Sequence, residues 1–430
     1  MAKVCVDGFN LSLPKGSGIA TYSRNLIEAL EALDHQTQVL YGPQGEISDD
    51  GLLNTVALAD ITASKAKIGK YARWWMTRSA PLGRVAHPIN VSDDIIWSTL
   101  GGGKPSTSRF WASRKLFDYA LRAQRLRGHF TPVRFSGQDA PDVMHWTCPL
   151  PLHAPGRVNV YTFHDLIPLK LPHTTGEQKA AFLAMCREIV ERADHLVAVS
   201  ETTRRDLMSM LSVPPEKITT TYQSVSAPTE ALNISVSETA DYISNVFDLE
   251  WKNYFLFYGA IEPKKNVGRL IEAYLSSGVT KPLVIVGGRS WLDAGEGSLI
   301  ASVIDSDNRV RKGQIIKHDF LSAAMLNALV RGARATLFPS LYEGFGLPVL
   351  ESMLLGTAVL TSTTGSLPEV AGDAALMVDP YDSEAIKAGI IALDGDDHLV
   401  SVLEDAGRKQ ATRFSTEAHR LRLAEVYDRL

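Results

Sequence analysis

Two glutamates flank a short glycine loop in the second half of this 430-residue chain. The segment from 338 to 351 reads Phe-Pro-Ser-Leu-Tyr-Glu-Gly-Phe-Gly-Leu-Pro-Val-Leu-Glu. We expect a strand to end at Phe338 and a helix to begin at Pro348, a residue suited to the first helical position. The start of such a helix offers backbone N–H groups to an anion. With Glu343 in the loop and Glu351 in the first turn of the helix, the segment suits a ligand with hydroxyls on both sides of a phosphate, such as a nucleotide sugar.

Taken alone, this spacing of two glutamates also fits an ordinary strand–loop–helix with carboxylates on its surface. A second acidic pattern, Asp305-Ser306-Asp307, formally matches a metal-binding pair of aspartates. It precedes Asn308 in a polar stretch, and turns rich in Asp and Asn are common. We therefore expect a turn there and no metal site.

Strand and helix patterns alternate on both sides of the glycine loop and indicate what positions it. Short apolar runs predict strands, and runs with apolar residues on one helical face predict helices. In the first half the expected strands are 4–6, 158–163 and 195–199, and the expected helices are 21–33, 176–193 and 202–211. In the second half the expected strands are 254–258, 282–286, 335–338 and 358–361, and the expected helices are 267–274, 323–331 and 348–355. This alternation is typical of parallel sheets covered by helices on both faces.

The pattern weakens between Thr221 and Asn253, and we place the hinge between two domains at 222–252. The fold class is therefore α/β, with two Rossmann-like, doubly wound parallel-sheet domains. Residues 1–225 are assigned to an N-terminal domain and residues 226–410 to a C-terminal domain. Residues 411–430 are assigned to a C-terminal helix that packs back toward the N-terminal domain. Since ligands bind at the carboxyl ends of strands in such sheets, the expected site is the cleft between the domains.

The segment 338–351 resembles the signature of family-four glycosyltransferases, including its Glu-Gly-Phe-Gly-Leu-Pro core. Further similar motifs follow the family's order from residue 7 to residue 380. They are Gly18-Ile19 with Tyr22 and Arg24-Asn25-Leu26, His164-Asp165-Leu166-Ile167-Pro168, Val199-Ser200-Glu201-Thr202-Thr203-Arg204, Gly259-Ala260-Ile261-Glu262-Pro263-Lys264-Lys265-Asn266, Gly365-Ser366-Leu367-Pro368-Glu369-Val370-Ala371-Gly372 and Val378-Asp379-Pro380. The resemblance is to the bacterial mannosyltransferase-like group of this family, and it implies the GT-B fold. It also implies that residues 1–225 form an acceptor-binding domain and residues 226–410 a nucleotide-sugar-binding domain.

The resemblance also implies roles for individual residues. Lys264 and Lys265 would hold the diphosphate of the donor, where a fixed cation stabilises the charge that develops on the leaving group. Glu351 would bind the ribose hydroxyls, and Glu343 would bind the donor sugar. The implied donor-binding residues are Lys264, Lys265, Leu321, Glu343, Gly344, Phe345, Gly346, Leu347 and Glu351. The implied catalytic residues are Glu343, Lys265 and His164, with His164 contacting the donor sugar from across the cleft.

The N-terminal motifs carry the rest of the implied site. Gly16 and Gly18 would let a loop approach the donor phosphates or the acceptor. His164 has a second interpretation, as a packed histidine at the end of a strand.

Two departures from the family pattern bear on these roles. Ala260 stands where many members carry arginine, so the two lysines that follow must hold the diphosphate without it. Ala20 and Thr21 stand where relatives often have Gly and Arg. This second departure concerns contacts with the acceptor rather than the donor site.

The resemblance implies transfer of a hexose from a nucleotide sugar with retention at the anomeric carbon. GDP-mannose is the favoured donor, and a lipid-linked or cell-surface polysaccharide, such as lipopolysaccharide, is the favoured acceptor. No metal and no cofactor are expected, because lysines and helix dipoles take the place of a metal. The alternatives are a transferase for a soluble acceptor (a disaccharide or sugar-phosphate synthase), a GT-B sugar-nucleotide epimerase and a non-catalytic sugar-nucleotide-binding protein. A dehydrogenase is disfavoured because no strand is followed by Gly-x-Gly-x-x-Gly.

The region 60–127 departs from the alternation and is strongly basic. It holds thirteen Lys and Arg residues and four Asp residues, a net charge of +9 in a chain of net charge −4. Its interleaved aromatic residues are Tyr71, Trp74, Trp75, Trp97, Phe110, Trp111, Phe117 and Tyr119. Because each Lys or Arg near an anionic bilayer contributes roughly 1 kcal/mol of binding, the region predicts a peripheral membrane contact. The alternatives are two solvated helices whose aromatics pack on the domain, and a nucleic-acid surface, which no accompanying motif favours.

Composition and charge are ordinary for a globular protein, with 45% hydrophobic and 21% charged residues. Three widely spaced cysteines indicate neither a disulfide framework nor a zinc site, which favours a reducing compartment. The N-terminus lacks the pattern of a signal peptide, and no run reaches the roughly 18–20 apolar residues that span a bilayer. We therefore expect a cytoplasmic protein, or one docked on the cytoplasmic face of the inner membrane.

Overall fold

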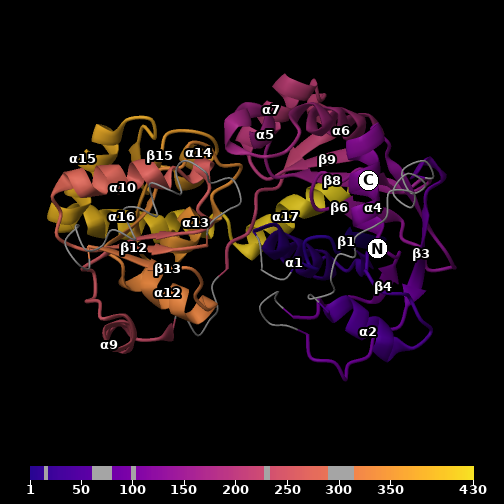
Figure 1. Cartoon of the computed structure of the whole chain (residues 1–430), viewed down its shortest axis with the longest axis horizontal. Helices are drawn as coiled ribbons and strands as arrows, with labels where there is room; N and C mark the ends of the chain where they lie inside the picture. The colour runs from indigo at the N-terminus through magenta and orange to yellow at the C-terminus, as the bar shows by residue number, and fades with distance from the viewer. Residues whose placement is uncertain (14–17, 61–79, 98–102, 227–232, 289–313) are drawn as a thin grey trace. The chain divides into compact units, whose positions relative to one another are not determined.

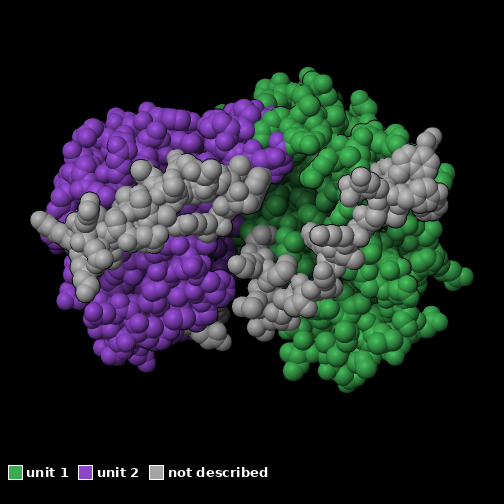
Figure 2. Space-filling view, in the orientation of Figure 1, with its two compact units in different colours: residues 1–166, 178–224, 416–430 green, residues 167–177, 225–415 purple. Residues whose placement is uncertain are grey.

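Two β-sheets organise the chain in the computed structural model, one in each of two units (Figure 1). The structure describes residues 1–13, 18–60, 80–97, 103–226, 233–288 and 314–430. Unit 1 comprises residues 1–166, 178–224 and 416–430, and unit 2 comprises residues 167–177 and 225–415 (Figure 2). Residues 167–177 therefore group with unit 2, which a single boundary at 225 did not anticipate.

The sheet of unit 1 has ten strands in the order β10-β9-β8-β6-β1-β2-β4-β3-β5-β7. Their bounds are β1 Lys3–Asp7, β2 Gln36–Tyr41, β3 Arg84–Ile89, β4 Arg109–Ala112, β5 Thr131–Phe135, β6 Val143–Trp146, β7 Leu152–His153, β8 Val158–Phe163, β9 His195–Ala198 and β10 Ile218–Thr220. Strands β10 to β4 run parallel, but β3 pairs antiparallel with β4, with His87 opposite Ala112. Since β5 and β7 run parallel to β3, the three strands at this edge run opposite to the rest of the sheet, a reversal that the sequence pattern did not predict.

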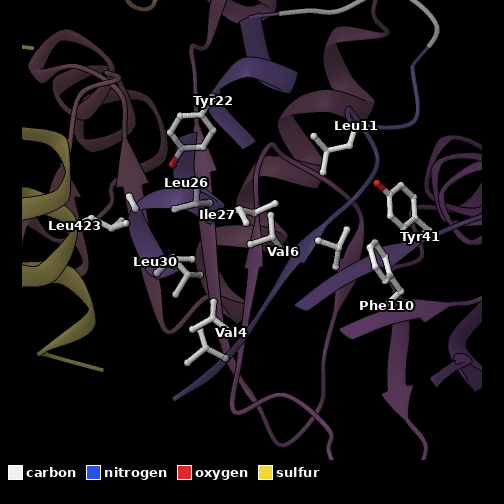
Figure 3. Close-up of a cluster of buried hydrophobic side chains, with 14 of the residues drawn as sticks. Val4, Val6, Leu11, Tyr22, Leu26, Ile27, Leu30, Tyr41, Phe110 and Leu423 are labelled. Atoms are coloured by element: carbon white, nitrogen blue, oxygen red, sulfur yellow. The ribbon is translucent and has the colours of Figure 1, made fainter. Parts of the chain in front are cut away.

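Helices cover the sheet of unit 1, and side chains of the helices and the strands together form the core of this unit. They are α1 Gly18–Glu31, α2 Gly51–Ala59, η1 Ala80–Leu82, α4 Leu116–Arg127, α6 Lys179–Arg192, α7 Glu201–Leu211, η4 Pro215–Lys217 and α17 Thr416–Tyr427. One face of α1 buries Tyr22, Leu26 and Leu30 against the apolar side chains of β1 (Figure 3). Leu423 of α17 joins the same cluster, so the last helix of the chain packs in unit 1.

The sheet of unit 2 has six parallel strands in the order β13-β12-β11-β14-β15-β16. Their bounds are β11 Phe255–Tyr258, β12 Leu283–Val286, β13 Ile315–His318, β14 Ala335–Phe338, β15 Ala358–Ser362 and β16 Leu376–Val378. The helices are α5 Ile167–Lys170, η3 Pro172–Thr174, α9 Val236–Phe247, η5 Pro263–Lys265, α10 Val267–Ser277, α12 Ala323–Gly332, α13 Leu347–Leu354, α14 Leu367–Ala371, α15 Ser383–Gly395 and α16 Asp397–Thr412. Every residue of β11, β12, β14 and β15 is buried, as expected for strands covered on both faces.

Two elements of unit 2 differ from the sequence expectation. Helix α9 lies inside the segment taken as a hinge and begins with a capping box between Ser235 and Glu238. Helix α13 begins at Leu347 instead of Pro348, so Glu351 lies in its second turn and not in its first. Within the described part of the chain, no helix is both long and apolar enough to cross a membrane.

Candidate active site

Two glycines bring the loops after β11 and β12 together in unit 2. The N–H of Gly259 donates to the carbonyl oxygen of Val286 at 2.9 Å. A β-carbon at Gly287 would lie 1.9 Å from the carbonyl oxygen of Gly259, so no larger residue fits there. The carboxyl ends of these strands therefore form a close-packed floor, where ligands bind in sheets of this kind.

The lysine loop after β11 is fastened to the glutamate loop after β14. Asn266 adopts a left-handed conformation with φ +61° and is the N-cap residue of helix α10. Its Nδ2 donates to the carbonyl oxygens of Pro339, at 3.0 Å, and Pro380, at 2.7 Å. The N–H of Leu341 donates to the carbonyl oxygen of Lys264 at 2.7 Å. These bonds fix the two loops in register, so the predicted lysines and Glu343 are brought together.

Lys265 and Glu343 form an ion pair, with 2.6 Å between Nζ and Oε1. The side chain of Lys265 is 16% exposed and that of Glu343 is 11% exposed. The neighbouring Lys264 forms a longer ion pair, with 3.6 Å between its Nζ and Oε2 of Glu262. Burial alone would raise the pKa of Glu343, but the charges of Lys265 and Lys264 and hydrogen bonds from Lys265 and Ser340 outweigh it and lower that pKa. Glu343 is therefore an ionised carboxylate beside a largely buried cation, and this cation is the residue predicted to face the diphosphate.

The backbone of the glutamate loop is held by glycines and a serine. Gly346 caps α13 with φ +112°, and Gly365 has φ +64°. A β-carbon at Gly365 would lie 2.8 Å from the carbonyl oxygen of Glu343 and 2.9 Å from its nitrogen. The hydroxyl of Ser366 is placed to donate to the carbonyl oxygens of Glu343 and Phe345. The loop before α13 thus has a defined path that directs the first amides of the helix toward any anion bound there.

Glu351 stands on α13 beside the end of β11. The hydroxyl of Tyr258 lies 3.3 Å from its Oε2 and 2.8 Å from the carbonyl oxygen of Pro348. Burial raises the pKa of Glu351, while the Tyr258 hydroxyl and the charge of Lys265 lower it less. This carboxylate is desolvated and has few partners, which suits an acceptor of hydrogen bonds from ligand hydroxyls.

The other predicted donor-site residues also follow the carboxyl ends of strands in unit 2. Gly344 and Phe345 belong to the glutamate loop, and the buried Phe345 ring packs against Phe414 with 5.7 Å between centroids. Leu347 is the first residue of α13. Leu321 lies half-buried in the loop between β13 and α12.

The predicted residues of the N-terminal half lie in unit 1. Gly18 begins α1, whereas Gly16 lies outside the described residues, as do Asp305 and Asp307. His164 follows β8, and its Nε2 lies 2.9 Å from the carbonyl oxygen of Thr147. Within the described ranges, no group of three or more His, Cys, Asp or Glu side chains is placed to hold a metal ion.

A series of buried side-chain hydrogen bonds fixes Tyr22, whose ring packs on His164. The Tyr427 hydroxyl contacts Nδ1 of His145 at 2.7 Å, and Nε2 of the same ring contacts the Thr162 hydroxyl at 2.8 Å. Thr162 in turn contacts the hydroxyl of Tyr22 at 2.8 Å. The Tyr22 ring meets the His164 ring edge-on, with 5.0 Å between centroids. Helix α17 thereby takes part in positioning the loop that carries His164.

Sequence reasoning missed three polar residues that organise these loops: Asn266, Tyr258 and Gln223. Asn266 stood inside a recognised motif, and its position before a helical pattern was a usable signal for a turn. Tyr258 reads as one more apolar residue of a strand. Gln223 lies in the segment taken as a hinge, yet its Nε2 is 3.3 Å from Nδ1 of His164.

The same two halves of the chain match known protein families. Residues 16–227 match the model of Glycosyltransferase Family 4, and residues 243–410 match that of Glycosyl transferases group 1. The chain belongs to the family-four glycosyltransferases, and it is a glycosyltransferase enzyme.

Among the relatives, the chain is similar to O-antigen chain mannosyltransferase B of Escherichia coli, with 32% identity over 60% of this chain and 67% of the relative. It is 29% identical to O-antigen chain mannosyltransferase RfbU of Salmonella typhimurium over 60% of this chain and 65% of that protein. The fold matches that of sucrose-phosphate synthase from Thermosynechococcus elongatus, with a TM-score of 0.68 and 16% identity over 100% of this chain and 99% of that one. The expected two-domain GT-B fold is thereby confirmed.

Proposed function

We propose that this enzyme transfers mannose from GDP-mannose, with retention at the anomeric carbon, to a lipid-linked or cell-surface polysaccharide acceptor. The observation that carries the proposal is the largely buried Lys265–Glu343 pair beside the start of α13, with Glu351 on the same helix. This constellation offers a cation and amides to a diphosphate and a carboxylate to ribose hydroxyls. The choice of sugar and acceptor is supported by two relatives, both O-antigen mannosyltransferases.

The proposed chemistry needs no nucleophile from the enzyme. The bond between the anomeric carbon and the diphosphate oxygen breaks while the acceptor oxygen bonds to that carbon on the same face. The acceptor's proton passes to the departing phosphate oxygen. Lys265 and Lys264 stabilise the charge that builds on the diphosphate, and Glu343 stays ionised and holds Lys265 in place.

Metal independence is part of the proposal, since the lysines and the start of α13 offer the positive charge that a divalent ion would otherwise supply. We expect the transfer rate to be unchanged by EDTA. A rate that falls with EDTA and returns with Mg²⁺ or Mn²⁺ would contradict this part of the proposal.

The donor is tested by thermal unfolding with GDP-, UDP-, dTDP- and ADP-sugars in EDTA. A ligand at a hundredfold excess over its Kd stabilises by about 2.7 kcal/mol, which shifts the unfolding midpoint measurably. We expect GDP-mannose to shift the midpoint and Glu351→Ala to remove the shift. A shift with another nucleotide alone would reject GDP-mannose, and no shift with any donor would contradict the assigned donor site.

The acceptor is tested by transfer of radiolabelled mannose to a membrane extract. Label in the lipid-linked fraction supports the proposal. Label in a soluble disaccharide or sugar phosphate would favour a soluble acceptor. Release of the nucleotide with an epimerised sugar and no transfer would identify an epimerase. With a lipid-linked acceptor, the reaction would take place at the cytoplasmic face of the inner membrane.

A further inference from the structure

The hydrogen bonds of His164 fix which of its ring nitrogens carries the proton. Nε2 lies 2.9 Å from the carbonyl oxygen of Thr147, and a carbonyl oxygen only accepts, so Nε2 is the donor. Burial lowers the pKa of His164, and the Thr147 carbonyl and the charge of Asp165 oppose this less strongly. The ring is therefore neutral at pH 7, and Nδ1 is an acceptor.

This tautomer in turn fixes the orientation of the Gln223 amide. The Gln223 side chain approaches Nδ1 of His164 at 3.3 Å, and only its NH₂ group can donate there. Its Oε1 must then point the other way. That oxygen is buried and has no hydrogen-bond partner within the described structure.

The chain around Gln223 is held on both sides. The N–H of Thr221 donates to the carbonyl oxygen of Ala198 at 3.1 Å, and Tyr222 is left-handed with φ +58°. Asn25 Nδ2 donates to the Ser224 hydroxyl at 2.9 Å. Because the backbone is fixed and the amide is bound to His164, Oε1 cannot easily turn to another donor. A buried acceptor left unsatisfied is destabilising, and its persistence calls for an explanation such as a bound ligand.

We propose that Gln223 positions the substrate, with its Oε1 accepting a hydrogen bond from a hydroxyl of the donor sugar or the acceptor sugar. Both ring nitrogens of His164 already have partners, Thr147 at Nε2 and Gln223 at Nδ1. His164 therefore orients the Gln223 amide and does not itself bind the sugar. The inference rests on the proposed function and assigns a hydroxyl-binding role to a residue outside the recognised motifs. It moves the polar contact with the sugar from His164 to Gln223.

The test combines Gln223→Met with deoxy sugars. Methionine keeps the length of the side chain without a hydrogen-bonding oxygen. We expect kcat/KM to fall about tenfold, in the range of one lost hydrogen bond. Each hydroxyl of the donor mannose and of the acceptor sugar is then removed in turn. One deoxy substrate should cost the wild type about tenfold and the variant less than twofold, because the two changes remove the same bond. That substrate identifies whether the hydroxyl belongs to the donor or to the acceptor.

Two controls separate positioning from mere packing. Gln124 is also a buried glutamine of unit 1, and its Nε2 donates to the carbonyl oxygen of Ala181 at 2.6 Å. Gln124→Met should respond to every deoxy sugar as the wild type does. Gln223→Glu keeps an acceptor oxygen, so it should retain more activity than Gln223→Met. Its carboxylate should raise the pKa of His164 and add an ionisation to the pH profile of kcat/KM.

The outcomes are distinct. Gln223→Met with unchanged kcat/KM would overturn the inference, since water then suffices for Oε1. The inference would also be overturned if every deoxy sugar lowered kcat/KM equally in the wild type and in Gln223→Met. If the wild type transfers no mannose but another hexose, the proposed donor fails, and the deoxy comparison with that hexose still decides the role of Gln223.

Discussion

The Lys265–Glu343 ion pair links stability and activity at a single pair of residues. Replacing Lys265 by Met leaves Glu343 charged and largely buried, with the charge of Lys264 and the hydrogen bond from Ser340 to compensate in part. We expect a loss of about 3 kcal/mol in the free energy of unfolding, as is usual when one partner of a buried pair is removed. We also expect kcat/KM to fall by about a hundredfold, because a cation facing the departing diphosphate is lost. Urea unfolding and initial-rate kinetics measure the two effects.

Two further variants separate these effects. Lys265→Met combined with Glu343→Gln removes the unpaired charge and should recover part of the stability but none of the activity. Lys281→Met breaks the pair between Lys281 and Asp394, 2.7 Å apart in the same unit, and should leave kcat/KM within twofold. If the double variant recovers activity, the lysine has no role at the diphosphate.

The raised pKa of Glu351 predicts a pH dependence of nucleotide binding. Only the ionised carboxylate accepts hydrogen bonds at both oxygens, so affinity for GDP should fall as the pH drops through this pKa. Because burial raises it, the loss should begin above the ordinary glutamate value of 4.5. The effect on folding has the opposite sign, since a group with a raised pKa contributes stability at low pH and loses it as the pH rises. Calorimetry of GDP binding from pH 4 to 8 should show the fall in the wild type and its absence in Glu351→Gln.

At the scale of single residues, the sequence predicts which residues form the candidate site better than it predicts their protonation states. The motif at 338–351 pointed to Glu343 and Glu351, and the motif at 259–266 pointed to Lys265. The opposite pKa shifts of the two glutamates could not be predicted, because they depend on the lysine loop lying beside Glu343 and on the burial of Glu351, which its partners do not offset. Gln223 could not be found either, since its orientation follows only from the partner of His164.

Among the loops, the contact between Gly365 and the backbone of Glu343 predicts a selective loss of activity. Gly365→Ala strains a left-handed residue and places a methyl group 2.8 Å from the carbonyl oxygen of Glu343. We expect the glutamate loop to shift, with kcat/KM falling by at least about tenfold, since small misplacements at a reacting centre are costly. Steady-state kinetics and a thermal melt measure the outcome.

Gly278, at the C-terminal end of α10, offers a matched control in unit 2. It has φ +73°, yet a β-carbon there would meet nothing within 4 Å. Gly278→Ala should therefore lose about 1–2 kcal/mol of stability from backbone strain alone and keep its activity. Equal loss of activity in the two variants would show that the Gly365 contact has no special role.

Elements were predictable where burial imposes a clear pattern. Strands such as β11 and β14 are buried along their whole length, so they appear as continuous apolar runs. Helix α9 was missed because it buries only Thr239 and Ile243, while apolar residues such as Val236 and Val246 are exposed. The antiparallel pairing of β3 with β4 was missed because side-chain periodicity contains no information on strand direction.

For the whole molecule, the division into units does not follow chain order. Residues 167–177 and 225–415 form one unit, and the chain returns to unit 1 for α17. A linear pattern shows where alternation weakens, as it did near residue 222, but not that a short segment in the first half packs with the second. That segment begins at Ile167, so the chain enters unit 2 three residues after His164.

The basic region predicts binding to an anionic bilayer through its exposed part. Leu82 and Leu126 are 76% and 57% exposed, and Arg125 is exposed beside Leu126 on α4. The guanidinium of Arg84 lies 4.6 Å from the Tyr119 ring centroid, which places the start of β3 next to α4. Apolar and basic side chains on neighbouring elements suit the boundary between headgroups and acyl chains. We expect sedimentation with vesicles containing phosphatidylserine, and none with neutral vesicles.

Charge reversal decides whether this surface or the total charge is responsible. Arg125→Glu changes the local charge by two and should weaken vesicle binding about tenfold or more, at roughly 1 kcal/mol per charge. Lys409→Glu makes the same change of charge at an exposed position of α16, in unit 2, and should leave vesicle binding within twofold. Leu126→Asp should weaken binding even in high salt, where charge is screened and apolar insertion persists. If Arg125→Glu and Lys409→Glu weaken binding equally, the bilayer responds to net charge and the surface near α4 has no specific role.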